Sequence, residues 1–299
     1  SQASYLVGCQ RTGEAIIIDP VRDLTKYMEV ADSEGFTITQ AAETHIHADF
    51  ASGIRDVAEQ LNANVYVSGE GDDELSYRNM PEQTHFVKHQ DIIHVGNIKL
   101  EVLHTPGHTP ESISFLLTDE GGGSSVPMGL FSGDFVFVGD IGRPDLLEKS
   151  VQMEGSTEVS AKQMYQSIES VKDLPDYIQI WPGHGAGSPC GKALGAVPMS
   201  TLGYEKINNW AFNVTDESKF VETLTSNQPA PPHHFAQMKK INQFGMNMYQ
   251  PYDVFPSLDN ARIAFDLRSK EAFHGGHTEG TINIPYNQNF INQIGWYLD

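Results

Sequence analysis

The segment Thr44-His45-Ile46-His47-Ala48-Asp49 lies at the end of a strand-like run that covers residues 39–44. His45 and His47 are separated by one residue, so their side chains face the same side of an extended chain. Imidazole and carboxylate groups gathered this closely are ligands that suit zinc or iron. The segment therefore predicts a metal site at a strand end, where open α/β sheets place functional groups.

Three further turns carry a histidine or an aspartate directly after an apolar run. They are Thr105-Pro106-Gly107-His108-Thr109, Ser132-Gly133-Asp134 and Trp181-Pro182-Gly183-His184-Gly185. A single histidine in a turn is more often a surface or capping residue than a ligand. Four strand ends that converge on one edge would instead build a metal site, and we expect these four to do so.

The first 200 residues alternate apolar strand-like runs with helical stretches. Strands are predicted over residues 15–19, 39–44, 64–68, 92–96, 98–105, 112–118, 128–134 and 176–181, and helices over residues 24–34, 56–62 and 158–171. Gly35 is expected to end the first helix. This mixture predicts an α/β fold in which packed sheets are covered by outer helices.

The chain is acidic, with 19 lysine and arginine residues against 39 aspartate and glutamate residues and a formal charge of −20. Such a surface repels phosphate backbones and anionic lipids, so we expect neither nucleic-acid nor membrane binding. No apolar run approaches the ~20 residues that span a bilayer, and no signal-peptide pattern is visible. Only two cysteines occur, Cys9 and Cys190, so we expect a protein of the reducing cytoplasm without a disulfide framework.

The ordered motifs HxHxD, GHT, SGD and PGHG resemble the metallo-β-lactamase superfamily over about residues 1–200. The resemblance implies an αββα sandwich. Many binuclear members carry a histidine directly after the aspartate of the first motif, but Phe50 stands there in this chain and cannot bind a metal. The run GDIGRPD, residues 139–145, looks like the persulfide dioxygenase branch, which is close in sequence to glyoxalase II hydrolases.

This resemblance implies one Fe(II) per chain, held by His45, His108 and Asp134, with zinc as the alternative metal. It further implies that the remaining residues of the motifs, His47, Asp49 and His184, orient ligands or water, or else bind a second metal. The implied reaction uses O2 to oxidise a low-molecular-weight thiol persulfide to free thiol and sulfite, or onward to thiosulfate, in sulfide detoxification. The alternative is a glyoxalase II-like binuclear thioester hydrolase. Superfamily resemblance also implies a homo-oligomer.

Three residues outside the ligand set are further candidates. Arg143 is expected either to bind a substrate oxyanion or to form a salt bridge with Asp140 or Asp145. Thr109, directly after His108, is assigned to substrate binding. Cys190 lies among small residues near Lys192, which favours an accessible thiol of lowered pKa that relays sulfur, although a lone cysteine is more often inert. Cys9 is predicted to lie in the core.

The metallo-β-lactamase-like domain is predicted over residues 1–203. The rest of the chain is predicted to form a linker with helices over residues 204–252 and a C-terminal unit over residues 253–299. In the linker, His233 and His234 are expected to be solvated. The C-terminal unit resembles the start of an α/β rhodanese-like domain, through Asp266-Leu267-Arg268, Glu271-Ala272-Phe273 and residues 276–285 (GHTEGTINIP). A rhodanese carries sulfur on a cysteine beyond this point, and no cysteine follows Cys190. A docking unit without sulfurtransfer remains the alternative for this part.

Overall fold

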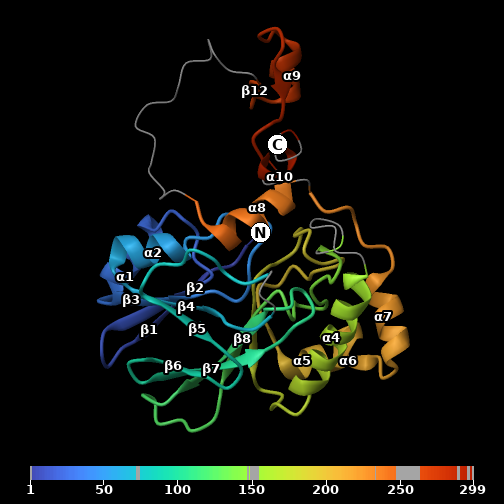
Figure 1. The fold of residues 1–299 in the computed structure, drawn as a ribbon. Coiled ribbons are helices and arrows are strands. Elements are labelled where there is room, and N and C mark those ends of the chain that lie inside the picture. Colours follow the sequence, from blue (N-terminus) through green and yellow to red (C-terminus); the bar gives the residue numbers. More distant parts are fainter. Residues whose placement is uncertain are drawn as a thin grey trace.

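The computed structural model describes residues 2–71, 75–146, 148, 155–232, 234–246, 263–287, 290–294 and 297. Two sheets lie face to face, and helices cover the outer face of each (Figure 1). This arrangement is the expected αββα sandwich. Among the described residues, no helix has the length and apolar character that crossing a membrane requires.

The first sheet is mostly parallel. Its strands lie in the order β1 (Tyr5–Cys9), β2 (Glu14–Ile18), β3 (Thr37–Ala42), β4 (Asn64–Ser68) and β5 (Thr84–Val87). Only the β1–β2 pair is antiparallel. Helices α1 (Thr25–Glu34) and α2 (Ile54–Leu61) connect parallel neighbours, and Gly35 ends α1 in the left-handed conformation as predicted.

The second sheet is mostly antiparallel. Its strands lie in the order β11 (Ser200–Thr201), β10 (Gln179–Pro182), β9 (Gly129–Gly133), β8 (Ile113–Asp119), β7 (Ile98–His104) and β6 (Ile92–Val95). Strands β9 and β10 are parallel, and the crossover between them contains α4 (Ser156–Val171). Because β9 and β10 run in the same direction, the residues that follow them meet at one edge.

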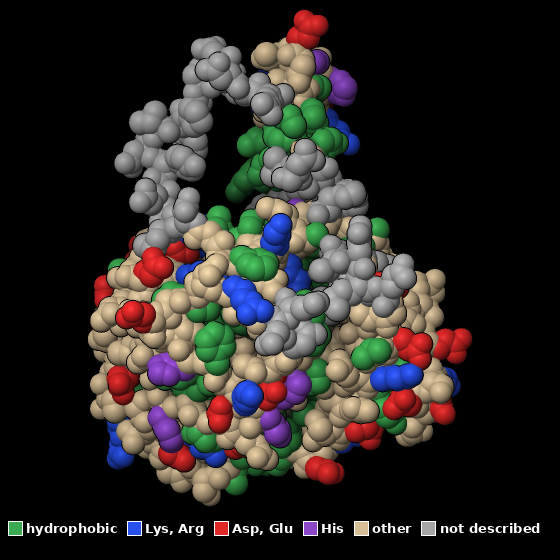
Figure 2. All heavy atoms as spheres, in the orientation of Figure 1, with side chains coloured by type: hydrophobic (Ala, Val, Ile, Leu, Met, Phe, Trp, Pro, Cys, Tyr) green, Lys and Arg blue, Asp and Glu red, His purple; other side chains and the backbone are tan. Residues whose placement is uncertain are grey.

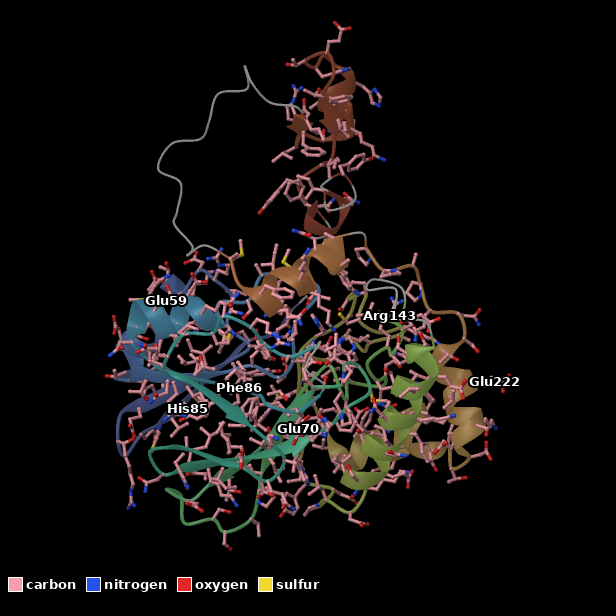
Figure 3. The ribbon with its side chains drawn as sticks, in the orientation of Figure 1. Glu59, Glu70, His85, Phe86, Arg143 and Glu222 are labelled. Atoms are coloured by element: carbon pink, nitrogen blue, oxygen red, sulfur yellow. The ribbon has the colours of Figure 1, made fainter. Side chains whose placement is uncertain are left out.

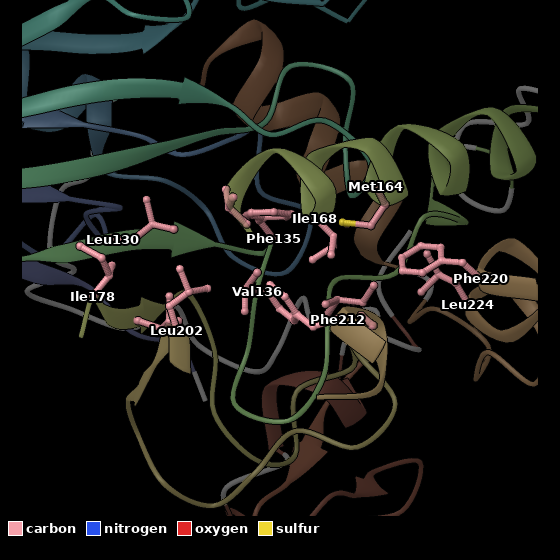
Figure 4. Packing of buried hydrophobic residues seen from close by; sticks show 14 of the residues in the cluster. Leu130, Phe135, Val136, Met164, Ile168, Ile178, Leu202, Phe212, Phe220 and Leu224 are labelled. Atoms are coloured by element: carbon pink, nitrogen blue, oxygen red, sulfur yellow. The ribbon is translucent and has the colours of Figure 1, made fainter. Parts of the chain in front are cut away.

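Alternation along the strands explains the layers. On β2, Ile16 and Ile18 face the second sheet and pack in a cluster that includes Phe115, whereas Ile17 faces the other way and packs with Val57 of α2. On the far side of the second sheet, Met164 and Ile168 of α4 belong to one buried cluster with Leu130 and Ile180. Figure 4 shows Met164, Ile168 and Leu130 of this cluster. Cys9 is buried between the sheets, as predicted.

Where the structure describes the predicted linker, its helices are α5 (Leu202–Asn208), α6 (Trp210–Asn213), α7 (Glu217–Thr225) and α8 (His234–Phe244). The first three contribute buried residues to the core of the sandwich. Phe212, Phe220 and Leu224 are buried in the same cluster as α4 (Figure 4). His234 is buried rather than solvated, because it begins a helix that packs onto the body of the protein, and His233 lies outside the described residues.

The described C-terminal residues form small elements. Strands β12 (Phe265–Asp266) and β13 (Ile282–Asn283) pair in parallel, and helices α9 (Lys270–His274) and α10 (Phe290–Ile294) accompany them. In this part of the chain, the strand that contains Asp266 is two residues long. On the face seen in Figure 2, acidic side chains are spread over the described surface, and lysines and arginines lie scattered among them.

Candidate metal centre

The four strand-end turns do converge. His45 follows β3, His108 follows β7, Asp134 directly follows β9 and His184 follows β10. Oδ2 of Asp134 lies 3.4 Å from Nε2 of His108 and 3.9 Å from Nε2 of His45. The ligand atoms of these three residues all lie within 4.8 Å of one another. Each side chain is almost fully buried, so the sandwich holds the three groups in fixed positions.

Both imidazoles of this trio turn Nε2 toward Asp134. The Thr44 hydroxyl donates to Asp19, so its oxygen accepts the Nδ1 proton of His45 at 3.0 Å. Nδ1 of His108 lies 2.9 Å from the carbonyl oxygen of Arg143 and donates to it. The lone pair of each Nε2 is therefore free for a metal, and partners of this kind fix the ring orientation of metal-binding histidines.

The donor set fits a divalent transition metal. Both carboxylate oxygens of Asp134 are buried and have no hydrogen-bond partner among the described residues, an arrangement that a bound ion would satisfy. Burial lowers the pKa of His45 and of His108, which favours neutral imidazoles. Burial alone would raise the pKa of Asp134, but His184 and His108 bring it well below its usual range. Two neutral imidazoles and one carboxylate make a facial triad.

A second group of potential ligands adjoins the first. The ligand atoms of Asp49, His184 and Cys190 lie within 4.8 Å of one another. Nε2 of His184 lies 3.3 Å from Oδ1 of Asp134 and 3.4 Å from Oδ2 of Asp49, so His184 connects the two groups.

His47 belongs to neither group. Its Nε2 lies 3.2 Å from Oδ1 of Asp19 and 3.9 Å from Oε1 of Glu43. The ring of Phe50 packs on it, with ring centroids 4.4 Å apart. Phe50 thus occupies space beside the histidine pair with a group that cannot bind a metal.

Arg143 forms a salt bridge with Asp145, which is one of the two roles expected for it from the sequence. It is fully buried and pairs with both carboxylate oxygens of Asp145, at 2.6 and 2.7 Å. Figure 3 labels its place in the fold. Its guanidinium also donates to the carbonyls of Pro189 and Pro229. With these donors engaged, the guanidinium holds loops together and is not directed at a substrate.

The other two candidates are also buried. The hydroxyl of Thr109 lies 2.6 Å from that of Ser112 and is engaged within its own turn. The accessible thiol predicted at Cys190 is wrong, because its side chain is 1% exposed and packs with Phe235 of α8. Burial, together with the charge of Asp134, raises the pKa of Cys190 to about 12. Lys192 does not lower it, since its ammonium donates to the carbonyl of Thr223 instead.

Two glycines explain why the turns are built from small residues. A Cβ on Gly142 would lie 1.9 Å from the carbonyl oxygen of Asp134, and one on Gly183 would lie 2.7 Å from Oδ1 of the same residue. Both contacts are shorter than any van der Waals approach allows. The backbone of each loop can therefore reach Asp134 only without a side chain.

Several residues around the centre were not predicted. Asp19 directly follows β2 with a positive φ of 52° and accepts from both the amide and the hydroxyl of Thr44. Its position after an apolar strand is the same signal that marked the candidate ligands. Glu111 accepts the amide proton of Ile46. Lys239 and other residues of α8 carried no sequence signal, because that helix lies far away in the chain.

Comparison with known proteins agrees with this geometry. The family model described as the metallo-beta-lactamase superfamily matches residues 1–184. A hydroxyacylglutathione hydrolase of Dictyostelium discoideum is 29% identical over 247 residues, which are 81% of either chain.

Two solved structures are similar along most of the chain. The metallo-beta-lactamase from Staphylococcus aureus subsp. aureus COL is 74% identical with a TM-score of 0.94, over 100% of this chain and 85% of that one. ETHE1 from Myxococcus xanthus is 26% identical with a TM-score of 0.64, over 81% of this chain and 93% of that one. With the family model matching more than half of its length and the motif residues gathered at one buried centre, the chain belongs to the metallo-beta-lactamase superfamily.

Proposed function

We propose that this protein is a non-haem Fe(II) dioxygenase that oxidises a low-molecular-weight thiol persulfide to sulfite and free thiol. The observation that carries the proposal is the ligand grouping. His45, His108 and Asp134 form one compact trio, while His47 turns to Asp19. A trio of two histidines and one carboxylate is typical of non-haem iron oxygenases, whereas a binuclear hydrolase needs more ligands than this.

The comparisons support the superfamily and do not separate its branches. The similarity to ETHE1, at 26% identity, is matched by the similarity to hydroxyacylglutathione hydrolases at 28–29%. Phe50 and the GDIGRPD run favour the dioxygenase. In the structure, Phe50 covers His47, and Gly142 within that run allows the loop to touch Asp134.

Iron held by the trio would supply the electron-transfer chemistry that dioxygen requires. The overall reaction is RSSH + O2 + H2O → RSH + H2SO3, in which the persulfide loses four electrons and dioxygen gains four. The chain's own residues orient the ligands. Thr44 and Asp19 fix the ring of His45, and the Arg143 carbonyl fixes that of His108. Asp49 and His184 would orient the water that the reaction consumes.

Oxygen consumption tests this proposal. Anaerobically iron-loaded protein is mixed with glutathione persulfide in an oxygen electrode, and sulfite and thiosulfate are measured in the product. We expect uptake that requires both iron and persulfide and is absent with zinc-loaded protein. Iron-loaded protein that consumes no oxygen with glutathione, coenzyme A or cysteine persulfide would refute the proposal.

A zinc-dependent thioester hydrolase is the second candidate. It is favoured by the adjoining group of Asp49, His184 and Cys190, which offers ligands for a second metal. The hydroxyacylglutathione hydrolases among the relatives agree with it. Zinc-loaded protein that cleaves a glutathione thioester, with two metal ions per chain, would establish it in place of the dioxygenase.

The C-terminal unit over residues 253–299 is proposed to begin a rhodanese-like module that serves the same sulfur chemistry, in a cytoplasmic homo-oligomer. The proposal for this unit is supported by the parallel β12–β13 pair and by α9, which are elements of an α/β unit. Sedimentation of the purified protein tests the assembly, and a binding assay with and without residues 263–299 tests docking.

A further inference from the structure

Helix α8 directs one face at the metal centre. Phe235, Lys239, Asn242 and Gln243 are buried and recur at the spacing of a single helix face. The exposed residues Gln237 and Lys240 lie on the other side of the helix.

The two ends of this face touch the loops that carry the site. Phe235 packs in a cluster with Ala48 and Cys190. One helical turn beyond Lys239, the Asn242 amide donates to the carbonyls of His47 and Phe50, at 2.8 and 2.7 Å. Since Lys239 lies between Phe235 and Asn242 on the same face, its side chain points at the metal centre.

The positive charge of Lys239 reaches the ligands. Burial is the main reason why the pKa values of His45 and His108 are low, and the charge of Lys239 adds to the effect in both residues. The ammonium is therefore near enough for its charge to act on two of the three candidate ligands.

Lys239 takes part in no ion pair among the described residues, and it is 4% exposed. Glu111 acts on it through its charge, but Oε1 of Glu111 accepts the amide of Ile46 and no ion pair joins it to Lys239. Burial disfavours the charged form of Lys239, so an anion that enters the centre is expected to bind beside it.

We propose that the Lys239 ammonium binds the anionic sulfur end of the substrate, and of its product sulfite, beside the three metal ligands. This inference rests on the proposed function and names the group that recognises the reacting end. The position next to His45 and His108 assigns it to the sulfur end rather than to a distant carboxylate of the thiol carrier. It also replaces Arg143, which Asp145 engages, as the cation of the site.

Sulfite binding tests the proposal without using oxygen. Sulfite is titrated calorimetrically into zinc-loaded protein, which cannot turn over, for the parent and for Lys239→Met, Lys239→Arg and Lys240→Met. We expect Lys239→Met to weaken sulfite binding at least ~10-fold, which corresponds to about 1.4 kcal/mol. Lys239→Arg should retain most of the affinity because it keeps the charge. Lys240→Met, the exposed neighbour, should stay within about twofold of the parent.

Metal content and thermal unfolding are measured on each variant, so a folding defect is recognised. Sulfite affinity of Lys239→Met equal to that of the parent would overturn the proposal, and so would a parent that does not bind sulfite. In the oxygen assay, we expect Lys239→Met to raise KM for the persulfide more than it lowers kcat. If sulfite binding depends on Lys239 but the protein takes up no oxygen with a persulfide, the dioxygenase proposal is refuted. The proposed anion site is then still supported.

Discussion

Arg143 and Asp145 form a bidentate ion pair inside the protein, with Nε 2.6 Å from Oδ1 and Nη2 2.7 Å from Oδ2. The same guanidinium donates to the carbonyls of Pro189 and Pro229, and the backbone carbonyl of Arg143 accepts from His108. One buried residue therefore joins three loops to His108, a proposed metal ligand. Its role is to hold the geometry of the centre.

We expect Arg143→Met to lower the free energy of unfolding by about 3–5 kcal/mol, because it removes the guanidinium that pairs with both oxygens of the buried Asp145 carboxylate. Urea unfolding measures the change. The double variant Arg143→Met/Asp145→Leu should recover much of the loss, since it removes both charges. A stable Arg143→Met protein with a raised KM would instead assign this residue to substrate binding.

Asp134→Ala should reduce bound iron to less than about a tenth of the parent amount, because it removes the one anionic ligand of the trio. Iron is measured by mass spectrometry after anaerobic loading. Iron at 100 times its dissociation constant should stabilise the parent by about 2.7 kcal/mol and leave the variant unchanged. Asp173→Ala, at an exposed position, is the matched control. Full iron content in Asp134→Ala would exclude the proposed ligand set.

Much of the fold and of the ligand trio could be predicted from the sequence, because their signals are local. The β4 strand has the predicted bounds, and Gly35 ends α1. His45, His108 and Asp134 each stand in a turn directly after an apolar run, and parallel and antiparallel strands bring such turns to a common edge.

The features that were missed depend on contacts between distant segments. The partner carbonyl that engages Arg143 comes from Pro229, 86 residues away. The small residues around Cys190 indicated an open loop, but Phe235 of α8 covers the thiol. Lys239 lies in a polar stretch of sequence, and only the packing of α8 on the loop after β3 shows that it is buried.

In metal-free protein, Cys190 should resist alkylation at pH 8 while the chain is folded. Its pKa is raised to about 12 by burial, so little thiolate is present at that pH. The raised pKa contributes stability that is fully present below about pH 9, the pKa of an unfolded thiol, and is lost as the pH rises toward 12.

Iodoacetamide labelling followed by peptide mass spectrometry measures this. Cys9 is the internal comparison for the rate of labelling. A hydrogen bond from the Asn97 amide lowers the pKa of Cys9, whereas the pKa of Cys190 is raised. Both cysteines should label equally in urea. Rapid labelling of Cys190 in the folded chain would show that α8 opens readily and that the thiol is available for sulfur relay.

Asn242→Ala should loosen the cover that α8 forms over the centre. The Asn242 side chain donates to the carbonyls of His47 and Phe50 and accepts from the amide of Ser52 at 2.9 Å, so it fixes the loop that follows the first ligand. Its removal takes the partner from one buried and two partly buried backbone groups, and we expect the free energy of unfolding to fall by about 2–4 kcal/mol. Because α8 also carries Lys239, sulfite affinity should fall with it.

Urea unfolding and sulfite calorimetry measure the two effects of Asn242→Ala, and Gln237→Ala, on the exposed side of α8, is the matched control. A variant of Arg55 separates the anchoring of the helix from the contacts of the Asn242 side chain. Arg55 holds the end of the same helix by donating to the carbonyls of Asn242 and Gln243. Arg55→Met should therefore lower stability while the Asn242 side chain keeps its contacts. If Asn242→Ala lowers stability but leaves sulfite affinity intact, the position of Lys239 does not depend on this clamp and is set by Phe235 at the other end of the helix.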